Sequence, residues 1–472
     1  MAEEPIATMQ KAFSFNMEMD KYGTIAEIGA GQEVSRFFFR AGGAAGTIAK
    51  TISAYDMDFS DAIYGEEKDK RYVTEKRVKK MLEKEFRLVL ERVGNKRSEK
   101  SAYFAFADTI TAKSYSQTGE CHGWMGIKLQ LFAGAAPCEV LLHVRMLDES
   151  NLMQQEAVGI LGVNLIYGAF KYYDDIERLI RSLGDNLEWG RLEIDLIRFT
   201  GPYFEDVDNR LMALKLVEME LSDAVVFASD RKTLLHPSEL FYKRDLMIMR
   251  SMFKPVTNVS VDMINSGMEI FLRTPGLDMQ RAMAVAEISI AEMRKLGTFN
   301  MQDILDRVDC LNLLNYPVIV SNYLRFFRVR EYLDRYTKGK VAFVIGIPNL
   351  TTLFDADYYV GLKGGMLAAF ASLFDRETIL FVYPMRSPED PGQVITAETF
   401  PVPDSLKYFY YYLQANDMIL PVERYNDANM HIWPEDILKQ IKKGRGDWES
   451  SVPEIVAEEI IDRGLFGFGS GR

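Results

Sequence analysis

A glycine-containing turn near the amino terminus is the first feature whose residue types could bind a ligand. The segment TIAEIGAGQEV, residues 24–34, places Gly29 and Gly31 between a strand-like run and an expected helix. Backbone N–H groups in such a turn can bind a phosphate, because glycine lets the backbone approach the ligand closely. A dinucleotide-binding turn needs a third small residue where Val34 stands. We therefore expect Gly29 and Gly31 either to bind an anionic ligand or to form a plain turn.

A thiol and an imidazole stand side by side at Cys121 and His122, in a region that also contains Asp108. Such groups could act as nucleophile and base. On a strand, however, neighbouring side chains point to opposite faces, so these two residues would not meet without a sharp turn. His122 remains a catalytic candidate by itself, with a purely structural role as the alternative.

Polar residues that follow the expected strands are further candidates, because ligands of open α/β sheets collect at the carboxyl ends of the strands. Arginines mixed with hydroxyl and carboxylate groups would suit a small phosphorylated or carboxylate-bearing molecule. The residues after Asp206 could instead cap a helix. We expect catalytic candidates at Asp148 and Asp208, and ligand-binding residues at Arg145, Asn209, Arg210, Ser321 and Asn322.

Several familiar sites are not predicted. The four histidines are scattered without ligand spacing and no carboxylate cluster has it, so no metal-binding residues are expected. Mg²⁺ brought in with a phosphorylated ligand is compatible with the sequence. The nucleophile elbow GxSxG, the HxGH pair of nucleotidyl transferases and the protein-kinase motifs are all missing.

The composition sets the class of protein. The 472 residues are 48% hydrophobic and 26% charged, which is typical of a globular chain. The net charge of -12 argues against nucleic-acid binding. Three cysteines without a CxxC pair and an acidic start without a signal peptide favour the cytoplasm. The longest apolar run, residues 158–170, is shorter than the roughly 18 residues that span a bilayer, so no membrane association is expected.

The elements that must position these residues begin with a mainly helical region. Apolar periodicity predicts helices over residues 32–40 and 73–93, with a tight turn over residues 41–46 between them. Aromatic and branched residues then predict strands over residues 103–107 and 124–132. We expect this amino-terminal region to end near residue 135.

From residue 139 onwards, short apolar runs alternate with helical stretches, which is typical of parallel strands covered by crossover helices. This predicts an α/β domain over residues 136–425 with a mostly parallel sheet, followed by a tail over residues 426–472. An open doubly wound sheet is preferred to a closed barrel, because residues 230–256 contain no clear crossover helix. The expected strands are 140–146, 192–199, 224–228, 259–264, 317–321, 341–345 and 378–383, and the expected helices 152–170, 207–221, 279–296, 323–336, 350–374 and 406–415.

Five stretches that span most of the chain resemble a family of uncharacterised bacterial proteins: GAGQEVSRFFFRAGGAAGTIAKTISAYDMDFSDAIYG, ECHGWMGIK, HVRMLDESNLMQQEAVGILGVNLIYGAF, GPYFEDVDNRLMALKLV and IGIPNLTTLFDADYYVGLKGG. Members of this family carry the transferred names nicotinate-nucleotide adenylyltransferase and TonB-dependent receptor. Such a receptor needs an export signal and barrel strands of alternating hydrophobicity, and we expect neither. The adenylyltransferase needs an HxGH pair, and no two histidines here are close enough in sequence.

The sequence therefore predicts a cytoplasmic protein that binds or transforms a small phosphorylated or carboxylate metabolite, nucleotides included. The alternative is a non-catalytic scaffold or interaction protein that forms homo-oligomers. Its motivation is the helix expected over residues 152–170, which is apolar on nearly every side after its first turn. A homo-oligomer is expected in either case.

Overall fold

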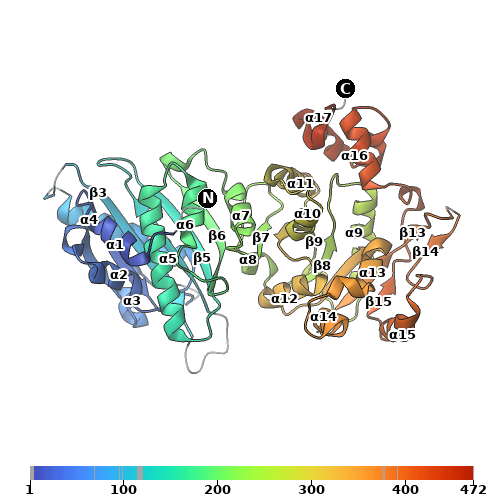
Figure 1. Ribbon diagram of the computed structural model, residues 1–472, viewed down its shortest axis with the longest axis horizontal. Helices are drawn as coiled ribbons and strands as arrows, with labels where there is room; N and C mark the ends of the chain where they lie inside the picture. Colours follow the sequence, from blue (N-terminus) through green and yellow to red (C-terminus); the bar gives the residue numbers. More distant parts are fainter. Residues whose placement is uncertain are drawn as a thin grey trace. The chain divides into compact units, whose positions relative to one another are not determined.

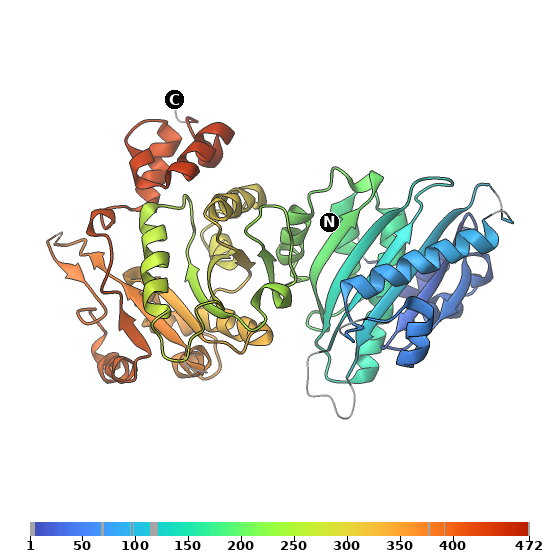
Figure 2. The same cartoon turned by 180° about the vertical axis from the view of Figure 1, so that it is seen from behind.

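The computed structural model describes residues 5–67, 70–94, 96–97, 99–113, 121–375, 378–390 and 392–470. The chain forms two compact units, the amino-terminal unit Met1–Asp223 and the carboxy-terminal unit Ala224–Arg472 (Figures 1 and 2). This division differs from the boundaries expected near residues 135 and 425. The reason is that β4 (Cys121–Leu129) and β5 (Cys138–Met146), on either side of residue 135, pair along their whole lengths.

The amino-terminal unit contains a mixed six-stranded sheet with the strand order β2-β1-β3-β4-β5-β6. β1 (Lys21–Ile28) runs parallel to both β2 (Ile48–Ile52) and β3 (Ala102–Thr111). From β3 to β6 (Leu192–Thr200) each neighbouring pair is antiparallel. The carboxyl ends of β1, β2 and β3 therefore lie at one edge of the sheet.

Helices cover both faces of this sheet. The apolar side chains of α1 (Thr8–Asn16), α2 (Glu33–Ala41), α5 (Asn151–Lys171) and α6 (Ile176–Leu183) build the larger core on one face. On the other face, α3 (Met57–Tyr64) and α4 (Glu75–Val93) build a second core, and Figure 2 shows α4 lying across the strands. A further helix, α7 (Asn209–Glu218), follows β6.

The core of the amino-terminal unit explains the apolar character of α5. Every residue from 157 to 170 is buried. A side chain at Gly162 would clash with Val34 of α2, since its Cβ would lie 2.3 Å from Val34 Cγ2. The bulk of Val34 is thus accommodated by a glycine on the neighbouring helix.

The carboxy-terminal unit contains a seven-stranded sheet with the order β15-β12-β11-β8-β9-β10-β7. All neighbours are parallel except β10 and β7, which are antiparallel. The sheet is open, with β15 and β7 as its edges, as preferred over a closed barrel. Its strands are β7 (Ala224–Phe227), β8 (Asp245–Arg250), β9 (Ala282–Ser289), β10 (Val318–Ser321), β11 (Val341–Gly346), β12 (Ile379–Tyr383) and β15 (Ile419–Pro421).

This sheet is doubly wound. α9 (Asn258–Phe271) packs on one face, where Gly267 leaves room for Met247 and Val344. The opposite face carries the core built with α12 (Phe326–Tyr336), α13 (Ile347–Leu353), α14 (Gly365–Leu373) and α15 (Lys407–Ala415). The expected tail is helical: α16 (Pro434–Lys443) is followed by α17 (Glu454–Arg463), whose Arg463 contacts Asp309 of α11 (Met301–Leu313) at 2.9 Å.

Two predictions for this unit were wrong, and one strand was not predicted. The stretch 259–264 is not a strand but part of α9, where buried Ser260, Ile264 and Phe271 recur at helical spacing. The stretch 279–296 is not one helix, since it contains β9 and the short α10 (Ile290–Lys295). The gap 230–256 holds β8, the middle strand of the sheet. Local apolar content predicted burial in each case, but not which backbone conformation would supply it.

One expected helix is interrupted. Residues 350–374 form α13, a short 3₁₀ turn and α14 rather than a single helix. Gly364 and Gly365 both have positive φ, at +82° and +58°, which ends any continuous helix at this point.

Among the described residues, no helix has both the length and the apolar character that a membrane span requires.

Candidate functional site

Two buried carboxyl groups lie side by side at the carboxyl ends of β1 and β3. Glu27 and Asp108 are register partners in this parallel strand pair. Their exposed fractions are only 2% and 1%. We call Glu27 and Asp108 the carboxyl pair.

Glu27 anchors the start of α2. Its Oε1 accepts a hydrogen bond from the backbone N–H of Val34 at 2.9 Å, and its Oε2 accepts one from Ser35 at 3.1 Å. Gln32, the N-cap residue, makes no capping hydrogen bond with its own side chain. A strand residue therefore satisfies the free N–H groups of the first helical turn, which a capping side chain would otherwise do.

Asp108 has one satisfied and one unsatisfied oxygen. The backbone N–H of Ile28 donates to Oδ1 at 3.1 Å. The buried Oδ2 has no hydrogen-bond partner within the described ranges. Burying a carboxylate oxygen without a hydrogen-bond partner costs free energy when the group is ionised, so burial favours the protonated form of Asp108.

The electrostatics of the carboxyl pair favour bound protons. Burial raises the pKa of Glu27 to about 7, partly offset by the two N–H groups of α2. Burial, together with the neighbouring charge of Glu27, raises the pKa of Asp108 well above its ordinary value. Both shifts favour the protonated form over the ionised one. Titratable groups tuned in this way are suited to general acid–base chemistry.

The two glycines of the turn after β1 have different roles. Gly29 has φ +102°, and a Cβ there would lie 1.8 Å from the carbonyl oxygen of Ile110. The close approach of β1 to β3 thus requires glycine at this position. Gly31 has φ +87°, and the atom nearest to a Cβ there would be Gln155 Oε1, at 3.4 Å. The backbone at Gly31 is therefore the more open of the two.

The start of α5 lies beside this turn. The backbone N–H of Lys113, just after β3, donates to Gln154 Oε1 at 2.8 Å, and Gln154 Nε2 donates to the carbonyl of Asp148 at 2.8 Å. Within the described residues, the N-cap residue Ser150 makes no side-chain capping bond, and the first turn of α5 contains no acid. The start of α5 thus lies beside Gly31 and carries partial positive charge. The start of α2 is already occupied by the carboxyl group of Glu27, and its first turn contains Glu33.

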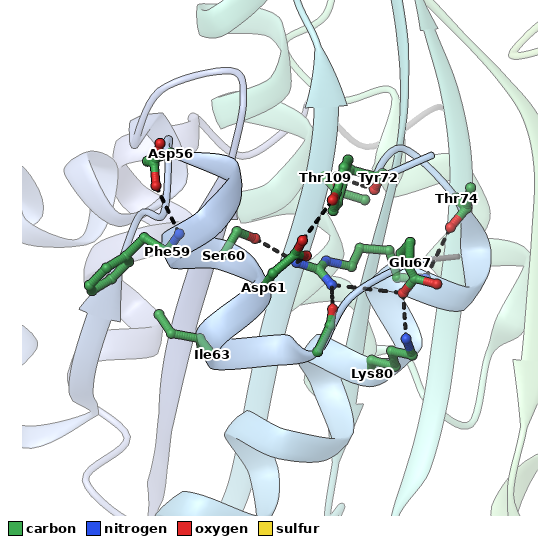
Figure 3. A network of polar contacts seen from close by, with 12 residues as sticks. Asp56, Phe59, Ser60, Asp61, Ile63, Glu67, Tyr72, Thr74, Lys80 and Thr109 are labelled. Atoms are coloured by element: carbon green, nitrogen blue, oxygen red, sulfur yellow. Dashed lines mark hydrogen bonds and ion pairs between the residues drawn. The ribbon is translucent and has the colours of Figure 1, made fainter. Parts of the chain in front are cut away.

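The segment between β2 and α4 is fastened on the face of the sheet opposite the carboxyl pair by a network around Arg77 (Figure 3). The Arg77 guanidinium donates to the carbonyl of Gly65 at 2.5 Å and to Ser60 Oγ at 2.6 Å. Thr109, the neighbour of Asp108, donates from its hydroxyl to the carbonyl of Tyr72 at 2.8 Å. Arg77 is fully buried, so this network has a structural role.

His122 also lies on the face of the sheet opposite the carboxyl pair. Its Nδ1 is 3.0 Å from Nε2 of His143 on β5, whose Nδ1 is 2.5 Å from Asp195 Oδ1 on β6. Cys121 belongs instead to the core on the α5 face. The prediction that Cys121 and His122 point to opposite faces is confirmed.

The strand-end residues of the amino-terminal unit do not converge. Arg145 donates to Glu193 at 2.5 Å, and Asp148 pairs with Arg191 at 3.0 Å. The convergence of these residues with Asp208 was expected for a parallel sheet, but β5 and β6 are antiparallel. Their carboxyl ends therefore lie at opposite edges of the sheet.

The residues around Asp208 have local structural contacts. Asp208 is the N-cap residue of α7 and accepts the N–H of Arg210 at 2.8 Å. Asn209 bonds both the N–H and the carbonyl of Phe199, at 2.7 and 3.0 Å. Arg210 is a half-buried residue of the first turn of α7. Capping, the simpler interpretation of Asp208, is what the structure shows.

Ser321 and Asn322 belong to the carboxy-terminal unit. Ser321 Oγ donates to Glu287 Oε1 at 2.5 Å, and the same oxygen accepts Arg250 Nη2 at 2.9 Å. This buried network joins the carboxyl ends of β8, β9 and β10. Asn322 follows it and is half-buried.

The sequence interpretation did not select Glu27, His143 or Asp195, and it mentioned Asp108 only as a neighbour of Cys121 and His122. A signal was present at two positions. Glu27 in TIAEI and Asp108 in YFAFADTIT are single acids within otherwise apolar strands. Burying an acidic side chain costs free energy unless it is paired or has a functional role, so such a position is a candidate functional residue.

Comparisons with known proteins give distant structural similarities only. No family model and no curated protein matches the chain. The chain is similar to the competence/damage inducible protein CihA from Agrobacterium tumefaciens, with 13% identity, 35% of this chain and 97% of that chain covered, and a TM-score of 0.25. It is also similar to the Plasmodium falciparum nicotinic acid mononucleotide adenylyltransferase, with 10% identity, 48% and 98% covered, and a TM-score of 0.27. Similarities this distant assign no activity to the chain.

Proposed function

We propose that the protein binds a small phosphorylated or carboxylate-bearing metabolite at the turn after β1, and that the carboxyl pair supplies acid–base chemistry there. The observation that carries this proposal is the unsatisfied, buried Oδ2 of Asp108 beside Glu27. Two like charges at neighbouring strand ends cost stability, and titratable groups whose pKa values are shifted in this way cluster at functional sites. The three cysteines are free thiols, in agreement with the proposed cytoplasmic location.

The anionic character of the ligand follows from the start of α5. The open backbone at Gly31 lies beside the start of α5, whose first N–H groups attract anions. The ligand would approach Gln155, whose amide is the nearest polar side-chain group to Gly31. The carboxyl pair does not oppose an anion as long as it retains protons.

A thermal-shift screen of the full chain with nucleotides, sugar phosphates and small carboxylates tests this proposal. A ligand at a concentration of about 100 Kd should stabilise the fold by roughly 2.7 kcal/mol. Gln155→Glu places a negative charge at the site and should abolish the shift. Gln302→Glu, an exposed change on α11 in the other unit, is the matched control and should retain it.

Two outcomes would count against the proposal. One is that no compound at millimolar concentration stabilises the protein. The other is that Gln155→Glu and Gln302→Glu respond equally to a stabilising compound. A positive shift that weakens from pH 6 to pH 8, as the carboxyl pair loses protons, would support the role of Glu27 and Asp108.

The scaffold alternative has lost the observation that motivated it. The apolar surface of α5 is covered by α1, α2, α6 and the sheet within its own unit, so no partner is needed to bury it. Light scattering would measure the assembly state directly. A large closed oligomer would revive the scaffold hypothesis.

A further inference from the structure

Two imidazole rings from neighbouring strands meet on the face of the sheet opposite the carboxyl pair. In the antiparallel pairing of β4 with β5, His122 is opposite Arg145 and Trp124 is opposite His143. The two histidines are therefore diagonal neighbours on one face. Their ring centroids are 5.2 Å apart, and His122 Nδ1 lies 3.0 Å from His143 Nε2.

Asp195 fixes the orientation of one ring. Its Oδ1 lies 2.5 Å from His143 Nδ1, on the side of the ring away from His122. This contact keeps the proton of neutral His143 on Nδ1, and it leaves the lone pair of Nε2 directed toward His122. A carboxylate behind an imidazole is the usual support of a metal-binding histidine, because it orients the ring and increases its basicity.

We propose that His122 Nδ1 and His143 Nε2 bind one transition-metal ion of the Zn²⁺ type, with Asp195 as the positioning residue behind His143. A tetrahedral ion with Zn–N distances of about 2.0–2.1 Å separates two nitrogens by about 3.3 Å. The observed 3.0 Å differs from this value by only a few tenths of an ångström. Small ring rotations would therefore open the site.

The protonation states are compatible with metal binding. Without metal, His122 donates its Nδ1 proton to the lone pair of His143. With metal, the proton of neutral His122 moves to its own Nε2 through solvent, so both nitrogens offer lone pairs and no net proton is released. Imidazole ligands suit Zn²⁺, Co²⁺ and Ni²⁺ rather than Mg²⁺ or Ca²⁺.

This site is independent of the proposed metabolite site. His122 and His143 share a face with Trp124 and the α4 core, whereas Glu27 bonds α2 on the other face. Failure of one proposal thus leaves the other intact.

Titration of the chelator-treated full chain with Co²⁺ tests the proposal, because protein-bound Co²⁺ has characteristic visible absorption and Zn²⁺ should displace it. One ion per chain is expected. His122→Gln should lower the affinity at least about tenfold, and Asp195→Asn about 10–100-fold although it removes no ligand. His431→Gln, an exposed histidine of the other unit, is the matched control and should bind as the wild type does.

The fluorescence of Trp124 gives a readout that does not depend on folding of a ligand variant. The Trp124 and His143 ring centroids are 4.9 Å apart, so a bound paramagnetic ion should quench this tryptophan. Trp124→Phe should bind Co²⁺ with the same absorption but lose most of the quenching. The proposal is overturned if folded wild-type protein binds no Co²⁺ or Zn²⁺, or if His122→Gln and His431→Gln bind equally well.

Discussion

Glu27 and Asp108 face each other in register across two parallel strands, and the backbone N–H of Ile28 joins the two residues by donating to Asp108. A pair of buried acids in this position makes stability depend on pH. The folded-state pKa values lie above those of the unfolded chain, so the folded state binds more protons between the two. The contribution of these protonated groups to the free energy of unfolding is fully present below about pH 4.5 and is lost as the pH rises through about 7.

Asp108→Asn should remove much of this dependence. We expect its free energy of unfolding to exceed that of the wild type by about 1–3 kcal/mol at pH 8 and to differ little at pH 5. Urea denaturation at the two pH values measures both. Asp206→Asn, an exposed acid of the same unit, should change neither. A destabilised Asp108→Asn at pH 8 would show that the ionised carboxylate is needed by the fold.

The two glycines after β1 should respond differently to alanine. Gly29→Ala places a Cβ against the Ile110 carbonyl and should cost at least about 3 kcal/mol or prevent folding. Gly31→Ala incurs mainly the strain of its positive φ, about 1–2 kcal/mol. Denaturation curves of the two variants measure the difference. Equal costs would contradict the geometry assigned to the β1–β3 contact.

Removal of the Arg77 guanidinium should release the segment shown in Figure 3. Arg77→Met leaves Asp61 and Glu67 without their buried cation and should cost about 3–5 kcal/mol. Arg77→Lys should rescue little, because one ammonium cannot replace a fork that bonds Gly65 and Ser60 together.

The control for Arg77 is Lys79→Met on the same helix. Its partially exposed pair with Glu75 should contribute less than about 1 kcal/mol. Thermal unfolding ranks the three variants. If Lys79→Met and Arg77→Met were equally destabilised, the network would not be the support that its burial indicates.

Cys310 should be unreactive in the folded protein. Burial raises the pKa of its thiol to about 12, so the nucleophilic thiolate is scarcely populated at pH 8. Iodoacetamide labelling followed by peptide mass mapping should find Cys310 unmodified in buffer and modified in urea. Equal labelling rates in the two conditions would show that α11 opens readily.

The sequence predicted the correct fold class because buried helix and strand faces produce recognisable apolar patterns along the chain. Helices such as α4 and α5 have apolar residues at helical spacing or throughout, and α2 starts after a glycine turn. Burial alone was less informative in the carboxy-terminal unit. Both β8 and α9 are apolar segments, and only their packing on each other separates strand from helix.

By itself, then, the sequence determined an α/β chain, a glycine turn after the first strand, and opposite directions for Cys121 and His122, and it favoured an open sheet over a closed barrel. These features depend on neighbours along the chain. Only the tertiary structure decided that Glu27 meets Asp108 and that His122 meets His143. Both meetings require a specific strand register: that of β1 with β3, which are distant in sequence, and that of the consecutive strands β4 and β5. Such a register is set by which strand face is buried and by the connection between the strands.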